Sequence, residues 1–171
     1  MPAPERFTSI ADYDEFQSEP TAGVIECLSK VGGTLLVLGA GGKMGPTLCR
    51  MALRAAAAGG YPLRVIAVSR FGDTSTRAVF DEMGCETIAA DLLDTSALAA
   101  LPDAQNIVYL AGQKFGSQHD EEQTWRMNAV LPTMVAERFP GSRFAVLSTG
   151  NVYPFSEPVT GGPLPDAPLG P

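Results

Sequence analysis

The sequence has 171 residues, of which 45% are hydrophobic and 18% charged, with a formal net charge of −7 at neutral pH. This is the size and composition of one globular domain, and it lacks the clustered Lys and Arg side chains that binding to nucleic acid phosphates needs. No apolar run approaches the roughly 18 residues of a membrane span, and residues 1–10 lack the features of a secretory signal. We therefore predict a cytoplasmic protein that binds neither nucleic acids nor membranes.

Residues 1–32 are predicted to form a helical N-terminal extension. Its two helices cover about 9–17 and 22–30 and are separated by Pro20, with Thr21 as a plausible N-cap of the second helix. An interaction surface made by this helix pair, on a chain that serves as a scaffold, is one alternative function.

Residues 33–153 alternate short apolar runs with helical stretches, which is the pattern of a parallel sheet with crossover helices. The predicted strands are 34–38, 63–68, 86–89, 106–110 and 143–147, and the predicted helices are 43–58, 74–83, 96–100 and 120–139. The predicted fold class is α/β, a doubly wound parallel sheet of the Rossmann type in three αβα layers. Residues 150–171 hold six prolines and four glycines, and we assign 154–171 to a loop leading to an absent C-terminal part.

A glycine-rich loop follows the first predicted strand and reads Gly-Ala-Gly-Gly-Lys-Met-Gly over residues 39–45. Glycine lets a phosphate approach the backbone without a Cβ atom in the way, and the N-terminus of the following helix favours an anion. Strand before, helix after and a second strand beyond favour a dinucleotide site over a tight turn that binds nothing. The predicted cofactor ligands here are Gly39, Gly41, Gly42, Lys43, Met44 and Gly45.

The end of the second strand bears on which nicotinamide cofactor is bound. An acidic residue there would bind the adenosine ribose of NAD, whereas an arginine would pair with the 2′-phosphate of NADP. The chain has Ser69 and Arg70 at this place and no acid. NADP is therefore predicted, with NAD as the remaining option and a solvent-facing Arg70 without a ligand as the alternative interpretation.

Three cysteines, Cys27, Cys49 and Cys85, are far apart and odd in number, which argues against a disulfide framework. No cysteine pair has the spacing of metal ligands and His119 is the only histidine, so no metal site is predicted. His119 precedes Asp120 near a predicted helix start, where a capping or surface residue is more common than a catalytic one.

The spacing Gly-x-x-Gly-x-x-Gly resembles the extended branch of the short-chain dehydrogenase/reductase family, the NAD(P)-dependent epimerases, dehydratases and reductases. The resemblance covers residues 34–153, although that family usually has Thr where this chain has Leu38. It implies that Asp91 binds the adenine amino group and that Leu92 covers the ring. A helix-capping role is the alternative for Asp91, one that Asp94 or Thr95 would serve better.

The same resemblance places Ala111 and Gly112 beside the nicotinamide ribose. It also implies that Asn128, four residues before Pro132 on the long helix, holds a water that relays protons to the active site. A proline removes the hydrogen bond to the carbonyl of residue i−4, which here is Asn128. A proline kink that serves packing alone explains the pair equally well.

The segment from Ser148 to Tyr153 is similar to the Ser-Ser/Thr-x-x-Val-Tyr signature of the extended family. By position, Thr149 is implied to hydrogen-bond a substrate oxygen beside the nicotinamide, with Ser148 as the neighbouring alternative. Dehydratases of the family carry Asp-Glu just after this Thr, where the chain has Gly150 and Asn151, so a sugar dehydratase is disfavoured.

The general acid of the resembled family, a Tyr followed four residues later by Lys, normally lies beyond the position of Pro171. Tyr153 is too close to Thr149 to be that residue. We expect part of a longer NAD(P)-dependent oxidoreductase or epimerase that transfers hydride to or from a small polar substrate, such as a nucleotide sugar, and is inactive as this chain alone. A short NADP-binding sensor without catalysis is the alternative. A homodimer is one option for the assembly.

Overall fold

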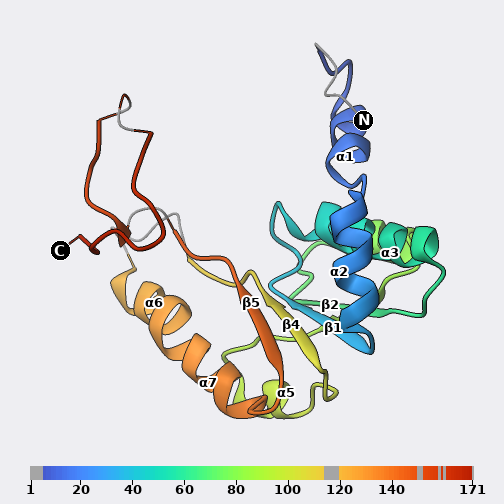
Figure 1. The fold of residues 1–171 in the computed structure, drawn as a ribbon. Helices are drawn as coiled ribbons and strands as arrows, with labels where there is room; N and C mark the ends of the chain where they lie inside the picture. Colours follow the sequence, from blue (N-terminus) through green and yellow to red (C-terminus); the bar gives the residue numbers. More distant parts are fainter. Residues whose placement is uncertain (1–5, 114–119, 150–151, 158, 160, 171) are drawn as a thin grey trace.

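Five parallel strands form one sheet in the order β3-β2-β1-β4-β5 (Figure 1). Their bounds are Thr34–Leu38 (β1), Arg64–Ser69 (β2), Glu86–Ala89 (β3), Asn106–Tyr109 (β4) and Arg143–Val146 (β5). Each predicted strand is present, with ends that agree to within one residue. The chain runs from β1 outward to β3 and then returns to β4, so the strand order reverses between β1 and β4. In open α/β sheets, ligands bind at the carboxyl ends of the strands at such a reversal.

This computed structural model describes residues 6–113, 120–149, 152–157, 159 and 161–170. His119, Gly150 and Asn151, which the sequence analysis considered, lie outside the described residues. The helices are Ile10–Gln17 (α1), Ala22–Val31 (α2), Gly45–Gly59 (α3), Thr74–Glu82 (α4), Thr95–Ala99 (α5), Glu121–Trp125 (α6), a π-helical turn at Arg126–Val130 (η1) and Leu131–Arg138 (α7). Within the described ranges, none of these helices combines the length and apolar character that a bilayer crossing requires.

Alternate residues of the strands build two cores on opposite faces of the sheet, because successive side chains of a strand point to opposite sides. Leu36 and Leu38 of β1 pack with α5 and α7. Leu35 and Val37 pack with α3 and α4, and Leu28 of α2 lies against the same core. The chain is therefore the predicted three-layer αβα structure, with an N-terminal helix added to one outer layer.

Both helices of the N-terminal extension form where the sequence predicts them. Ser9 caps α1 by accepting from the amide of Asp12 (3.1 Å), and Thr21 caps α2 by accepting from the amide of Val24 (3.3 Å). The end of α2 is held by the sheet, since the Arg143 guanidinium donates to the carbonyl of Val31 (2.9 Å).

The long helix predicted over residues 120–139 is present but interrupted. Between α6 and α7 the amide of Leu131 bonds to the carbonyl of Arg126, five residues back, which defines the π-helical turn η1. Pro132 follows at once in the first turn of α7 and has no amide hydrogen to continue the α-helical pattern. The predicted helix is therefore present, and the interruption that the sequence analysis associated with Pro132 takes the form of a wider turn just before the proline.

Candidate dinucleotide-binding site

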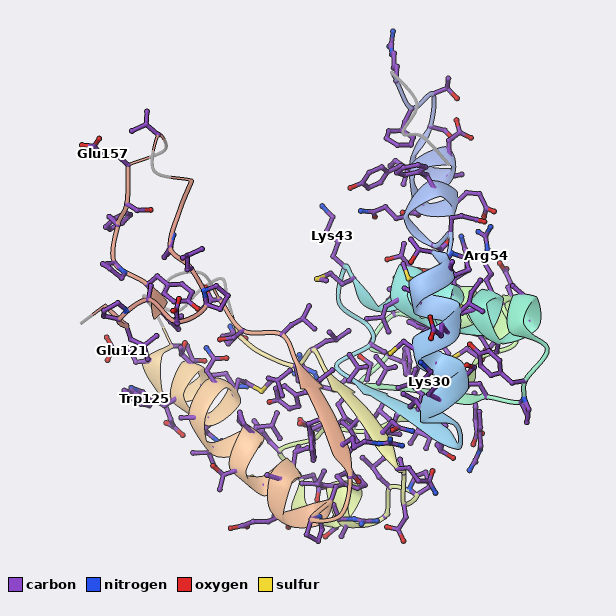
Figure 2. The ribbon with its side chains drawn as sticks, in the orientation of Figure 1. Lys30, Lys43, Arg54, Glu121, Trp125 and Glu157 are labelled. Carbon is purple, nitrogen blue, oxygen red and sulfur yellow. The ribbon has the colours of Figure 1, made fainter. Side chains whose placement is uncertain are left out.

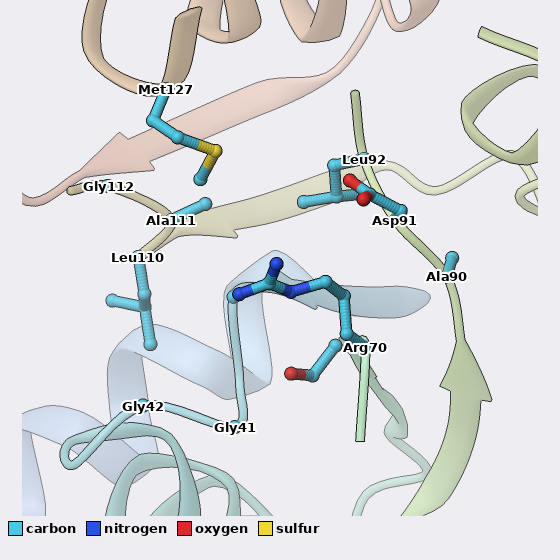
Figure 3. Close-up of a pocket in the computed structure, with 12 residues that line it drawn as sticks. Gly41, Gly42, Arg70, Ala90, Asp91, Leu92, Leu110, Ala111, Gly112 and Met127 are labelled. Atoms are coloured by element: carbon cyan, nitrogen blue, oxygen red, sulfur yellow. The ribbon is translucent and has the colours of Figure 1, made fainter. Parts of the chain in front are cut away.

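A cavity of about 300 Å³ opens at the carboxyl ends of the strands, at the strand-order reversal. It is lined by Gly39, Gly41, Gly42, Ser69, Arg70, Ala90, Asp91, Leu92, Leu110, Ala111, Gly112 and Met127 (Figure 3). Nine of these twelve residues were predicted from the sequence as cofactor ligands. Ala90, Leu110 and Met127 were not predicted, because they are ordinary apolar residues in no motif. Ala90 and Leu110 could have been found as the residues that directly follow β3 and β4.

The first glycine of the loop is required by its backbone and by its neighbours. Gly39 has a φ of +84°, and a Cβ atom there would lie 2.6 Å from the amide nitrogen of Ala111. The amides of Gly39 and Ala40 both donate to the carbonyl of Val68, at 2.9 and 3.0 Å. The hydrogen bonds tie the start of the loop to the end of β2, and the close approach to Ala111 places it against the residues that follow β4.

The remaining glycines of the loop differ in what surrounds them. A Cβ atom at Gly41 would lie 2.4 Å from the hydroxyl oxygen of Ser69, and one at Gly45 would lie 1.8 Å from the carbonyl oxygen of Ala40. Gly42 is exposed, and a Cβ atom there would meet nothing closer than the carbonyl oxygen of Gly39, at 3.4 Å. Gly45 therefore lets the first turn of α3 pack against the loop, whereas the space at Gly42 opens toward the cavity.

The N-terminus of α3 carries no side-chain cap. Each of the other described helices that begin from a loop has one, and the caps are Ser9, Thr21, Asp73, Asp94 and Asp120. The first amides of a helix need partners from outside the helix, and an anion is a suitable one. The helix begins at Gly45, two residues later than predicted, so Lys43 and Met44 belong to the loop.

Lys43, Met44 and Gly45 are predicted ligands that do not line the cavity. Gly45 is buried beneath the loop, whereas Lys43 and Met44 are exposed. Figure 2 shows the Lys43 side chain extending from the loop before α3 into open space. None of the ion pairs among the described residues includes Lys43.

Ser69 and Arg70 lie at the end of β2 and face the loop. The Arg70 guanidinium occupies the middle of the cavity, between the loop and the Asp91–Leu92 turn (Figure 3). No carboxylate of the described residues forms an ion pair with it. Arg64, on the same strand, instead forms a bidentate pair with Glu86. An uncompensated guanidinium in a cavity is suited to an anionic group.

Asp91 and Leu92 form the wall of the cavity beside β3. The Asp91 carboxylate accepts from the amide of Leu93 (3.0 Å), and Leu92 is buried. Asp94 caps α5 by accepting from the amides of Ser96 and Ala97. The capping role that was the alternative for Asp91 is thus filled by Asp94, and Asp91 remains at the cavity.

The far wall of the cavity is made by the end of β4 and by η1. Ala111 and Gly112 line it together with Met127, whose carbonyl accepts from the Tyr109 hydroxyl (3.5 Å). Burial of that hydroxyl raises the pKa of Tyr109 to about 12. Asn128 does not line the cavity, and its side chain bonds to the backbone of Gln113.

Ser148 and Thr149 follow β5 at the same end of the sheet. The amide of Leu147 still donates to the carbonyl of Tyr109 (3.2 Å), so the two residues come directly after the last pairing of β5 with β4. Both are exposed, and neither lines the cavity. Their predicted roles toward a substrate remain predictions.

None of the three cysteines is among the residues that line the cavity. Cys27 is exposed and Cys49 and Cys85 are buried, all as free thiols. A hydrogen bond with Cys85 and burial raise the pKa of Cys49, while the same hydrogen bond lowers that of Cys85. The described residues contain no group of three His, Cys, Asp or Glu side chains that could hold a metal ion.

Solved structures that resemble the chain share its fold at low sequence identity. An ADP-L-glycero-D-manno-heptose-6-epimerase from Helicobacter pylori is 17% identical, with a TM-score of 0.60 over 74% of this chain and 42% of that one. BdcA, solved in complex with NADPH, is 16% identical, with a TM-score of 0.53 over 71% of this chain and 53% of that one. A short-chain dehydrogenase/reductase superfamily protein from Agrobacterium tumefaciens with bound NAD is 22% identical, with a TM-score of 0.48 over 71% and 34%.

The chain therefore spans about half or less of the length of these structures. No relative of curated function matches the sequence. The model of the NAD dependent epimerase/dehydratase family matches residues 35–171, which include β2 to β5, all of β1 except Thr34, and every residue that lines the cavity. The chain belongs to the NAD dependent epimerase/dehydratase family.

Proposed function

We propose that this chain is the cofactor-binding part of an NADP-dependent oxidoreductase or epimerase of the extended short-chain type. The observation that carries the proposal is the cavity at the strand-order reversal, in which a glycine loop and an unpaired Arg70 face the same space. A dinucleotide places its phosphates over the loop between β1 and α3 in folds of this kind. The protein as a whole would pass hydride to or from a small polar substrate.

The residues present fit a bound dinucleotide. The space above Gly42 and the uncapped N-terminus of α3 suit the pyrophosphate, because amide hydrogens and the helix dipole favour an anion. Lys43 adds a cation at the edge of the same loop. The adenosine would lie between the ends of β2 and β3, with Leu92 against the base and Asp91 near its amino group.

Arg70 supports NADP as the preferred cofactor. The residue that directly precedes it, Ser69, is not acidic, so no carboxylate at the end of β2 is available to a ribose 2′-hydroxyl. A guanidinium binds a phosphate through charge-assisted hydrogen bonds, which are stronger than neutral ones. An adenosine 2′-phosphate placed between the loop and Asp91 would meet Arg70 without displacing an ion pair.

The bound nicotinamide would supply or accept the hydride. The chain's own part is to hold the cofactor across the strand ends and to bring Ser148 and Thr149 to the end of β5, where a hydroxyl could hydrogen-bond a substrate oxygen. The similar Helicobacter pylori structure is an epimerase named for an ADP-linked sugar, which supports a nucleotide sugar as the substrate class. The Tyr and Lys that the resemblance assigns as general acid are not among the 171 residues, so the activity is proposed for the whole protein.

A non-catalytic NADP sensor is the second candidate. It is favoured by the position of Ser148 and Thr149, which are exposed and do not line the cavity. The two candidates share the cofactor and differ in turnover. Incubation of the whole protein with sugar nucleotides tests this: a net oxidoreductase would change the nicotinamide absorbance, an epimerase would convert the sugar nucleotide into its isomer with no net change of the cofactor, and a sensor would do neither.

Fluorescence titration with NADPH and with NADH tests the proposal. We expect saturable binding of both, with tighter binding of NADPH. A protein with no measurable affinity for either cofactor would overturn the proposal, and tighter binding of NADH would overturn the assignment of Arg70 to a 2′-phosphate.

A further inference from the structure

The side-chain amide of Asn128 binds both backbone groups of one residue on another segment. Its Oδ1 atom accepts from the amide of Gln113 (2.8 Å), and its Nδ2 atom donates to the carbonyl of Gln113 (2.9 Å). Gln113 follows the end of β4, fifteen positions before Asn128 in the sequence. The amide thus pairs with the backbone as a neighbouring strand would, and it extends the hydrogen bonding of β4 beyond the strand's last residue.

Further contacts join the same two segments. A Cβ atom at Gly112 would lie 3.3 Å from the Asn128 Oδ1 atom, so the helix passes close to the backbone there. The Tyr109 hydroxyl donates to the carbonyl of Met127. The end of β4 is therefore held from Tyr109 to Gln113 by consecutive residues of η1.

The π-helical turn accounts for this arrangement. Met127 and Asn128 are adjacent within η1, and Met127 lines the cavity while Asn128 binds Gln113 beside it. Such π-helical turns inside α-helices are frequent at functional sites. Here two consecutive residues of the turn lie at the border of the cavity. Met127 forms part of its wall, and Asn128 binds the Gly112–Gln113 segment beside it.

The held segment lies at one end of the proposed cofactor site. Arg70 and Asp91 mark the adenosine end beside β2 and β3, whereas Ala111 and Gly112 lie across β1, beside β4. An extended dinucleotide bound over the loop has its nicotinamide half at the β4 end. We propose that Asn128 is a positioning residue, which fixes the Gly112–Gln113 backbone so that it can contact the nicotinamide half of the cofactor. The inference rests on the proposed function.

This role differs from the proton relay that the family resemblance implies for Asn128. A relay acts during turnover and leaves the affinity for the cofactor unchanged. A positioning role acts on one half of the cofactor before any reaction. Loss of Asn128 would then change the affinity for ligands that reach Gly112. It would leave unchanged the affinity for ligands that occupy only the adenosine end.

The test compares two ligands on three variants. NADPH spans the whole site, whereas adenosine 2′,5′-bisphosphate represents only its adenosine end. We expect Asn128→Ala, which removes both hydrogen bonds to Gln113, to weaken NADPH by about tenfold. Asn128→Asp keeps an oxygen that can accept from the Gln113 amide but loses the donor to its carbonyl, so it should weaken NADPH less, and both variants should leave affinity for the bisphosphate unchanged. Thr133→Ala is the matched control, because it removes one hydrogen bond to the backbone on the same helix, to Ala129, away from the cavity.

Hydrogen exchange gives a readout that needs no ligand. The Gln113 amide donates to the Asn128 side chain, so its exchange should be slower in the wild type than in Asn128→Ala, and unchanged by Thr133→Ala. Equal exchange of the Gln113 amide in the wild type and in Asn128→Ala would show that the Asn128 side chain does not hold this segment. Faster exchange combined with unchanged NADPH affinity, or with equal loss of both ligands, would overturn the positioning role. A wild-type protein that binds neither ligand, with the exchange difference intact, would instead reject the proposed function.

Discussion

The carbonyl oxygen of Ala40 lies 1.8 Å from the place that a Cβ atom of residue 45 would occupy. The two residues close the glycine loop against the first turn of α3, and only a residue without a side chain permits that closure. Gly42, three positions earlier, has no comparable neighbour and faces the cavity. Gly45 is therefore required for packing, whereas Gly42 leaves space for a ligand. Substitutions at the two positions should separate an effect on stability from an effect on binding.

Gly42→Ala should abolish or strongly weaken cofactor binding while leaving thermal stability nearly unchanged, because its Cβ atom meets no protein atom closer than 3.4 Å but enters the space for a phosphate. Gly45→Ala should destabilise the fold by about 1–3 kcal/mol through overpacking. Melting curves and NADPH titration of both variants measure the two effects. Undiminished affinity in Gly42→Ala, or in the charged variant Gly42→Asp, would contradict the assignment of the loop.

Arg70→Asp should shift preference from NADP toward NAD. It removes a charge-assisted bond to the 2′-phosphate, which corresponds to a loss of about tenfold to a hundredfold in NADPH affinity, and it offers a carboxylate to a ribose hydroxyl. Arg6→Asp, an exposed position before α1, makes the same change in net charge away from the cavity. Equal ratios of the two affinities in all three proteins would show that Arg70 does not contact the 2′-phosphate.

Tyr109 makes stability depend on pH in the alkaline range. Its pKa is raised by burial from 10.0 to about 12 in the folded protein, so the folded state holds the phenolic proton more tightly than the unfolded state does. The stabilisation is fully present below pH 10 and is lost as the pH rises toward about 12. Urea unfolding at about pH 8 and at about pH 11 measures this loss. Between the two pH values, the unfolding free energy should fall more for the wild type than for Tyr109→Phe.

The exposed residue Tyr13 supplies the control for that measurement. Tyr13→Phe should keep the pH dependence of the wild type. A pH dependence that Tyr109→Phe leaves intact would show that other groups cause it.

Arg54 holds the first helix of the extension in place. Its guanidinium donates to the carbonyl and the carboxylate of Glu15, to the Ser18 hydroxyl (3.1 Å) and to the carboxylate of Glu19. No residue of α1 is buried, so this cluster is the principal polar link between α1 and α3. Arg54→Ala should therefore accelerate hydrogen exchange throughout α1 and change the melting temperature little.

Lys30→Ala is a suitable comparison for Arg54→Ala. It removes an exposed ion pair with Glu26 within α2, and such pairs contribute little to stability. Equal exchange rates of α1 in both variants would mean that the Arg54 cluster does not hold the helix.

The strands and the glycine loop could be predicted because local sequence determines them. A run such as Thr34–Leu38, bounded by glycines, can only be buried on both faces, and the spacing of Gly39, Gly42 and Gly45 leads directly to a loop before a helix. The position of Ser69 and Arg70 at the cavity followed from their place at the end of a parallel strand, whereas Asp91 came from the family resemblance.

The π-helical turn and the apolar wall of the cavity could not be predicted in this way. The turn depends on Pro132 together with contacts to Tyr109 and Gln113, which lie on a different segment. Met127 lines the cavity from within that turn, and no motif marks such an apolar residue as part of a site. The sequence likewise predicted α2 as a helix but not its packing, because its partner Arg143 lies 112 positions away.

The bond from Arg143 to Val31 has a practical consequence for where this domain begins. The family match starts at residue 35, yet the guanidinium of the last strand holds the final turn of α2, and Asn106 of β4 donates to the carbonyl of Gly32 (2.8 Å). A fragment cut at the family boundary would lose Leu28 from the core and leave both side chains without these acceptors. We therefore expect a fragment that retains α2 to be more stable than one that starts at residue 35.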